Sequence, residues 1–244
     1  MAIGESAGRP MIAVVIDDMG LNQRRSTAMA NLPAPLTLSY LPYANDLPRQ
    51  TAQARAQGHE LMVHVSMQPI GGDNPGPNAL TVDLPSDEIK QRLNWALSRF
   101  EGYVGINNHM GSRFTADRDG MAAVMTELKA HGLLFVDSRT GPRSLGSASA
   151  AAQGVPHTAR HVFLDHDING EAIARQLAET EQTARQTGYA VAIGHPHDLT
   201  IKALADWLPS LAAKGFIQVP VSAIVARTET RQGAAQSSLT PKTP

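Results

Sequence analysis

The chain has 244 residues, of which 42% are hydrophobic and 18% are charged, as is typical of a globular protein with a sizeable core. Its formal net charge is −1, and it has no basic stripe, so nucleic acid is not an expected partner. The lack of cysteine excludes disulfides, thiolate metal sites and cysteine nucleophiles. No apolar run is long enough to predict a membrane-spanning helix.

Apolar runs of strand length alternate with segments of helical period along the chain. Residues 11–16 form a continuous apolar run, which is typical of a parallel strand covered on both faces. Further strands are predicted at residues 36–41, 60–65, 103–107, 133–136, 160–164, 190–193, 216–219 and 221–225. Helices are predicted between them, at residues 22–31, 46–57, 86–100, 117–131, 144–153, 169–187 and 200–214.

This alternation predicts a parallel sheet in an α/β fold. A barrel is favoured over an open doubly wound sheet, because polar clusters follow nearly every strand and no phosphate-binding glycine pattern follows the first. Residues 11–227 are therefore predicted to form one α/β barrel. Residues 1–10 are expected to be a flexible N-terminus. Residues 228–244, rich in Thr, Gln, Ser and Pro, are expected to be a disordered tail.

Aspartates and histidines recur directly after the predicted strands, at the rim where barrel active sites form. They are accompanied by two arginines, and the full set is Asp17, Asp18, His64, His109, Arg113, Asp137, Arg139, Asp165, His195 and His197. Each residue alone also has an ordinary structural interpretation, such as a turn or a helix cap. A scatter of surface charges would not select six strand ends, however, so the pattern predicts a metal site of Asp and His on the rim.

Several of these segments resemble the divergent polysaccharide deacetylase family. They are VIDDMG at 15–20, HVSMQP at 64–69, GINNHMGSRFT at 105–115, VDSRT at 136–140, FLD at 163–165 and AIGHPH at 192–197. The resemblance covers residues 11–225, and the run at 105–115 is long and specific. It implies a distorted seven-stranded (β/α) barrel, similar to the carbohydrate esterases that remove N-acetyl groups from chitin-like or peptidoglycan sugars.

The resemblance also implies roles for single residues. Asp17 matches the general base of those esterases, Asp18 matches a metal ligand, and His64 matches the first metal-binding histidine. Their second metal-binding histidine lies four residues further on, where this chain has Gln68. Zinc rarely accepts a neutral amide where an imidazole is expected. His109, from the adjacent strand, is therefore our candidate for the third ligand.

The remaining rim residues are expected to support catalysis or to bind substrate. His195 matches the general acid by strand order, and His197 is an extra histidine nearby. Arg113 or Arg139 is expected to orient a carboxylate or to bind an anionic sugar substituent. Asp137 and Asp165 are expected to brace the site or to contact substrate.

Together these features imply a metal-dependent hydrolase that removes N- or O-acetyl groups from a cell-envelope polysaccharide. Zinc is the expected metal, although manganese, nickel and cobalt also suit such ligands. The resemblance further implies a periplasmic or envelope location in a bacterium, with a mature domain that does not span the membrane. Two alternatives stay open: another barrel metallohydrolase, such as a phosphoesterase, or a non-catalytic envelope protein that binds a glycan or a partner, as Gln68 suggests.

Overall fold

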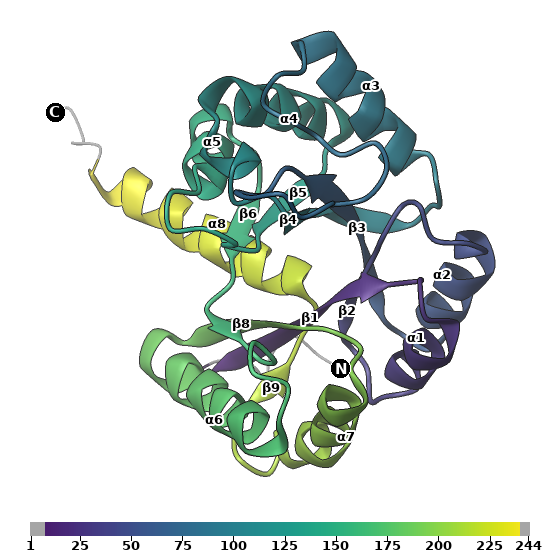
Figure 1. The fold of residues 1–244 in the computed structure, drawn as a ribbon. Coiled ribbons are helices and arrows are strands. Elements are labelled where there is room, and N and C mark those ends of the chain that lie inside the picture. Colours follow the sequence, from purple (N-terminus) through teal and green to yellow (C-terminus); the bar gives the residue numbers. More distant parts are fainter. Residues whose placement is uncertain (1–7, 240–244) are drawn as a thin grey trace, which may run out of the picture.

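A computed structural model describes residues 8–239, with side chains to residue 230. Within these residues, one parallel sheet of nine strands curls into an incompletely closed barrel, and helices α1–α7 lie around it (Figure 1). The strands are β1 (Met11–Met19), β2 (Thr37–Tyr40), β3 (Glu60–Met67), β4 (Tyr103–Met110), β5 (Leu134–Asp137), β6 (His157–Ala159), β7 (Val162–Phe163), β8 (Tyr189–Gly194) and β9 (Ile217–Gln218). The α-helices are α1 (Gln23–Ala30), α2 (Leu47–Ala56), α3 (Ser86–Leu97), α4 (Arg118–His131), α5 (Gly146–Gln153), α6 (Gly170–Thr187), α7 (Asp198–Trp207) and α8 (Val221–Leu239).

The strand order β6-β5-β4-β3-β2-β1-β8-β7, with β9 beside β1, confirms the predicted distorted α/β barrel. The described residues contain nine strands in place of the seven that the resemblance implies. Where one strand was predicted at 160–164, the structure has β7, with β6 directly before it, and the strand predicted at 216–219 is the short β9. Between β6 and β7 the Arg160 N–H donates to the carbonyl of Asp137 on β5, whereas the His161 N–H donates to the carbonyl of Val191 on β8. At residues 160–161 the chain therefore passes from one edge of the sheet, at β6, to the other edge, at β7. We call this crossing the seam.

Side chains of β1 alternate between two hydrophobic cores. Ile12, Val14 and Ile16 belong to the larger core, which the sheet shares with the surrounding helices. Ala13 and Val15 belong to a smaller core inside the barrel. The two-residue period of a strand accounts for this division. The same phase decides which polar residues at the strand ends face the barrel interior.

Helix α8 begins where the sequence predicted a strand at residues 221–225. The apolar positions Val221, Ile224 and Val225 follow a helical spacing, and they pack against inward-facing residues of β1, β3, β5 and β8. Figure 1 shows α8, in yellow, passing between β6 and β8. Its first turn thus fills the barrel interior beneath the polar strand ends.

The two ends of the chain extend beyond the predicted barrel. Helix α8 continues to Leu239 through most of the expected disordered tail, and residues 240–244 lie outside the described residues. Residues 1–7 of the expected flexible N-terminus lie outside them too, whereas Arg9 donates hydrogen bonds to the carbonyls of Ala212 and Phe216. In the part of the chain that is described, no helix has the length and apolarity needed to cross a bilayer.

Candidate metal and catalytic site

Two adjacent carboxylates at the end of β1 reach the same cavity, although consecutive strand residues normally point to opposite faces. Asp17 is in phase with Ala13 and Val15 and therefore points into the barrel. Asp18 has a φ of 55°, a left-handed conformation that is uncommon outside glycine. The pairing of β1 with β2 is irregular at this point. This local departure from strand geometry brings the second carboxylate to the cavity.

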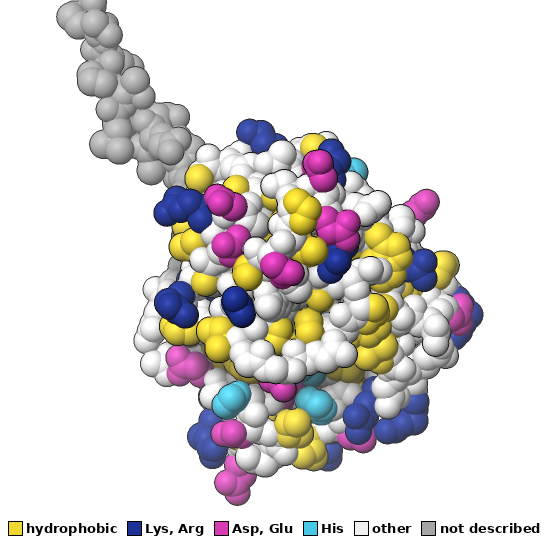
Figure 2. Space-filling model, turned by 45° about the horizontal axis from the view of Figure 1, so that its top comes forward, with side chains coloured by type: hydrophobic (Ala, Val, Ile, Leu, Met, Phe, Trp, Pro, Cys, Tyr) yellow, Lys and Arg dark blue, Asp and Glu magenta, His cyan; other side chains and the backbone are white. Residues whose placement is uncertain are grey.

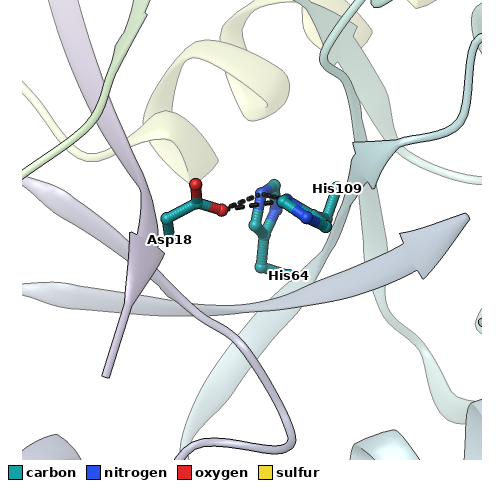
Figure 3. A group of neighbouring side chains, drawn as sticks. All are labelled: Asp18, His64 and His109. Carbon is teal, nitrogen blue, oxygen red and sulfur yellow. Dashed lines mark hydrogen bonds and ion pairs between the residues drawn. The ribbon is translucent and has the colours of Figure 1, made fainter. Parts of the chain in front are cut away.

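Two histidines from the neighbouring strands β3 and β4 meet Asp18. His64 is in phase with the inward-facing Met62 of β3, and His109 comes from the end of β4. Asp18 Oδ1 lies 2.9 Å from His109 Nδ1 and 3.4 Å from His64 Nε2. The two ring nitrogens are 3.2 Å apart, so three ligand atoms converge (Figure 3).

The three side chains fit a divalent metal. Asp18 Oδ1 is buried, and within the described residues it makes no hydrogen bond of acceptable geometry, although His109 Nδ1 is close. Buried polar atoms are rarely left without a partner. A cation between this oxygen and the two ring nitrogens would satisfy all three. One carboxylate and two imidazoles are ligands that zinc accepts, and three protein ligands leave a position open for water.

Asn107, a fully buried residue of β4, links the Asp18–His64–His109 group to the carboxylate of Asp17. Its Nδ2 donates a 2.7 Å hydrogen bond to Asp17 Oδ1. Its Oδ1 must therefore face His64 Nδ1, at 2.8 Å, and it accepts the proton carried there. This tautomer leaves the lone pair of His64 Nε2 facing Asp18 and His109, as a metal ligand requires.

Asp17 lies beside the Asp18–His64–His109 group but is not part of it. Its Oδ2 is 3.6 Å from His64 Nε2, and the residue is 3% exposed. Burial raises the pKa of the Asp17 carboxyl, although the charge of His195 and the hydrogen bond from Asn107 oppose this rise. For Asp18, burial is outweighed by the two histidines, which hold the pKa of that carboxyl well below its usual range. The two neighbouring carboxylates therefore differ in basicity, and Asp17 is the better proton acceptor.

A second group, built around His195, lies at the ends of β7 and β8. The Nδ1 of His195 is 2.9 Å from Asp165 Oδ1, and the His195 backbone N–H donates to Asp165 Oδ2 at 2.7 Å. Thr200 donates to the same Oδ2 at 2.8 Å. Burial lowers the pKa of His195, but the bond to Asp165 and the charge of Asp17 outweigh it and raise this pKa to about 9. His195 is therefore a cation at neutral pH, with a proton to donate.

Both groups open into one cavity of about 480 Å³. Its lining includes most of the residues that the sequence singled out, namely Asp17, Asp18, His64, His109, Arg139 and His195. Asp165 lies behind His195 and orients it. In Figure 2, histidine and acidic side chains lie together on the lower part of the face shown.

Three other predicted residues do not line this cavity. Arg113 is exposed, and its backbone N–H donates to the carbonyl of Gln68. Asp137 is out of phase with the inward-facing Leu134 and Val136, so it points away and instead accepts hydrogen bonds that order the following loop. His197 directly precedes helix α7, where its N–H donates to the carbonyl of His195.

Gln68, which occupies the position of an expected metal ligand, has a structural role in this chain. Its Oε1 accepts a 3.0 Å hydrogen bond from the backbone N–H of Val82, and its own N–H donates to Leu80. Gln68 thus fastens the loop between β3 and α3, residues 68–85, to the end of β3. His109 supplies the imidazole next to His64 instead.

Several contributors to the site were not assigned a role from the sequence. Asn107 shares the inward phase of β4 with His109, so the two-residue period was a usable signal for it. Arg160 also lines the cavity, but it lies at the seam between β6 and β7, where the sequence predicted a continuous strand. Thr200 acts from helix α7 through Asp165, and no sequence pattern indicates this contact.

The curled parallel sheet, with its polar groups at the carboxyl ends of the strands, has the fold of the polysaccharide deacetylases. Residues 14–225 match the divergent polysaccharide deacetylase family, and the chain belongs to this family. An uncharacterized protein of Haemophilus influenzae is 33% identical over 206 residues, which cover 84% of this chain and 74% of that protein. YibQ of Escherichia coli is 33% identical over 200 residues, covering 82% of this chain but only 63% of YibQ.

Solved structures show how widely this fold is used. Protein ATU2773 of Agrobacterium tumefaciens has a TM-score of 0.87 and 32% identity, with 89% of this chain and 90% of that chain covered. T48 deacetylase with substrate has a TM-score of 0.58 and 14% identity, covering 91% and 94% of the two chains. The pseudoenzyme BA3943 of Bacillus anthracis has a TM-score of 0.56 and 11% identity, covering 89% and 66%. The fold thus occurs in a deacetylase and in a pseudoenzyme, and function has to be argued from the site.

Proposed function

We propose that the chain is a zinc-dependent hydrolase that removes acetyl groups from a cell-envelope polysaccharide. The observation that carries this proposal is the convergence of three elements in one cavity: the Asp18–His64–His109 group, the separate carboxylate of Asp17, and the cationic His195. A metal-dependent hydrolase acting on an amide or ester needs a cation that polarises the carbonyl, a base that accepts the proton of water, and an acid that protonates the leaving group. An envelope glycan as substrate implies an extracytoplasmic location, which is part of the proposal.

The residues divide the chemistry as follows. A divalent metal held by Asp18, His64 and His109 would polarise the acyl carbonyl and lower the pKa of an attacking water from about 15.7 toward about 7. Asp17 accepts the proton of that water at Oδ2, because its Oδ1 already accepts from Asn107. His195 holds its transferable proton at Nε2, because its Nδ1 is bonded to Asp165. As the bond from the carbonyl carbon to the sugar nitrogen or oxygen breaks, His195 protonates the leaving atom, and acetate and the free sugar group are released.

Acetate release from an N-acetylglucosamine oligomer, measured together with bound metal, tests the proposal. We expect chelation to abolish acetate release and added zinc to restore it. Asp18→Asn should remove both the metal and the activity, whereas Asp167→Asn, an exposed carboxylate outside the cavity, should change neither. Full activity after chelation contradicts the proposal.

The same assay separates the two alternative functions. Release of phosphate from an ester, without release of acetate, would indicate a different metallohydrolase. Saturable binding of the oligomer without any turnover, as in a pseudoenzyme, would indicate a glycan-binding role.

A further inference from the structure

Two arginines line the cavity next to the proposed catalytic groups. Arg139 and Arg160 both contribute to its wall. Among the described residues, no carboxylate lies within 4.0 Å of either guanidinium, whereas the surface residues Arg24 and Arg25 share Asp198. The positive charge of the two cavity arginines is thus available to a ligand.

Arg160 is held in place without being neutralised. Its Nε donates to the carbonyl of Ser138 at 2.7 Å, and its Nη2 donates to the carbonyl of Arg139 at 2.8 Å. Its guanidinium also lies 4.9 Å from the ring centroid of Phe163. Neutral carbonyls and an aromatic ring fix the orientation of this cation but leave its full charge, which suits a binding site that is formed before the ligand arrives.

Arg139 lies beside Arg160 at the mouth of the cavity. Its φ is 49°, and its backbone N–H donates a 2.9 Å hydrogen bond to Asp137 Oδ1. The buried Asp137, which does not reach the cavity itself, thus helps to hold the backbone in this left-handed turn. The side chain of Arg139 is exposed and free to close over a ligand.

The charge balance of the cavity points to an anionic ligand. The carboxylates of Asp17, Asp18 and Asp165 are matched in number by the cations of His195, Arg139 and Arg160. Asp18 is paired with His64 and His109, and Asp165 with His195, whereas the two arginines have no carboxylate within 4.0 Å among the described residues, so an anionic ligand can pair with them. On the face shown in Figure 2, basic and acidic side chains are interspersed.

We infer that the cavity selects an acidic sugar, whose carboxylate or phosphate binds Arg139 and Arg160 while its acyl group lies at the Asp18–His64–His109 group. Guanidinium groups form paired hydrogen bonds with either anion. The acyl position rests on the proposed function, whereas the anion position rests on the arginines alone. A neutral chitin-like chain would leave both cations without a partner.

Calorimetric titration of the zinc-loaded full chain tests this inference. The ligands are a tetrasaccharide of alternating N-acetylglucosamine and N-acetylmuramic acid, the same tetrasaccharide with its carboxyls reduced to alcohols, and an N-acetylglucosamine tetramer carrying 6-phosphates. We expect at least one acidic ligand to bind about tenfold tighter than the reduced one, with a preference that weakens at high salt. The tighter of the two acidic ligands identifies the anion.

Arginine variants locate the preference. Arg160→Gln should abolish it, so that the acidic ligands and the reduced tetrasaccharide bind this variant with equal affinity. Arg139→Gln, at an exposed position, should reduce it even if Arg160→Gln fails to fold. Arg143→Gln, an exposed arginine outside the cavity lining, is the matched control and should retain the full preference.

The outcomes also separate this inference from the proposed function. Equal affinity for acidic and reduced ligands, or binding of none of them, overturns the acidic-sugar inference, and acetate release can still be observed in that case. Preferential binding of the acidic ligand without any acetate release supports the inference and overturns the hydrolase.

Discussion

Two trios of side chains at the rim of the barrel use the same residue types but differ in their hydrogen bonds. Asp18, His64 and His109 form one trio, and Asp165, His195 and His197 form the other. In each trio the candidate ligand atoms lie within 4.8 Å of one another. Residue identity and proximity therefore do not distinguish a metal site from a proton donor here.

The two aspartates make the difference. Asp18 Oδ1 is buried without a hydrogen bond from the described residues, so it can accept a cation. Asp165 uses Oδ1 for the ring of His195 and Oδ2 for a backbone N–H and for Thr200. An oxygen whose donors are already in place has little to gain from a metal, and its charge instead stabilises the protonated imidazole. Counting donors and acceptors thus supports the proposal that the first trio holds the metal and that the second provides the proton.

The largest expected effect comes from removing a histidine of the first trio. We expect His109→Ala to weaken zinc binding by more than about 100-fold. Loss of a residue that only hydrogen-bonds to a metal ligand weakens metal binding by about 10–100-fold, and His109→Ala removes a ligand itself. His197→Ala is the matched variant and should leave zinc affinity unchanged. Calorimetry with zinc measures both. The reverse result, a loss with His197→Ala only, would assign the metal to the second trio.

Asp165→Asn tests whether the second trio donates a proton. The cationic His195 is the active form, so the rate should be high below its pKa of about 9 and should fall as the pH rises through that value. Without the charge of Asp165, this pKa falls toward its ordinary value, and the basic limb of the kcat profile moves to lower pH. We expect kcat at neutral pH to drop by about 100-fold, while zinc affinity stays unchanged. A basic limb that does not move would contradict the assignment.

Much of this contrast was predictable from the sequence. The apolar run before Asp17 predicted β1, and the histidines at the ends of β3, β4 and β8 predicted a shared rim. The two-residue phase even indicates that Asp137 points away, since Leu134 and Val136 point inward. Applying that rule requires knowing which face of β5 points into the barrel. All four residues of this strand are buried, so their pattern does not show which face that is.

Other features depend on tertiary geometry that no local pattern encodes. The left-handed backbone of Asp18 reverses the direction that strand alternation predicts for it. The seam at Arg160 arises because the chain changes its hydrogen-bonding partner strand there. The strand predicted at residues 221–225 is a helix, because a short apolar run suits either structure. As a helix, this segment places its apolar side chains against the inward-facing residues of the barrel.

Asn107→Leu tests the link between the two carboxylates. The substitution removes the acceptor that fixes the His64 tautomer and the donor to Asp17 Oδ1. We expect zinc affinity to fall by about tenfold, the lower end of the range for residues that support metal ligands. Ser138→Ala removes only a 3.1 Å contact to the same amide and should change zinc affinity far less. Thermal unfolding of both variants shows whether a lost fold explains the result, and unchanged zinc affinity in a folded Asn107→Leu protein would contradict the tautomer argument.

The smallest expected effect is at Gln68, and it concerns stability alone. Gln68→Ala removes the acceptor for the Val82 N–H, so the free energy of unfolding should fall by about 1 kcal/mol in denaturant titration, with zinc affinity unchanged. Gln68→His places an imidazole at the position where related esterases carry a ligand. Because His109 already supplies the imidazole beside His64, we expect no gain in zinc affinity from this variant. A gain in zinc affinity would mean that the first trio lacks a ligand that a histidine at position 68 can supply.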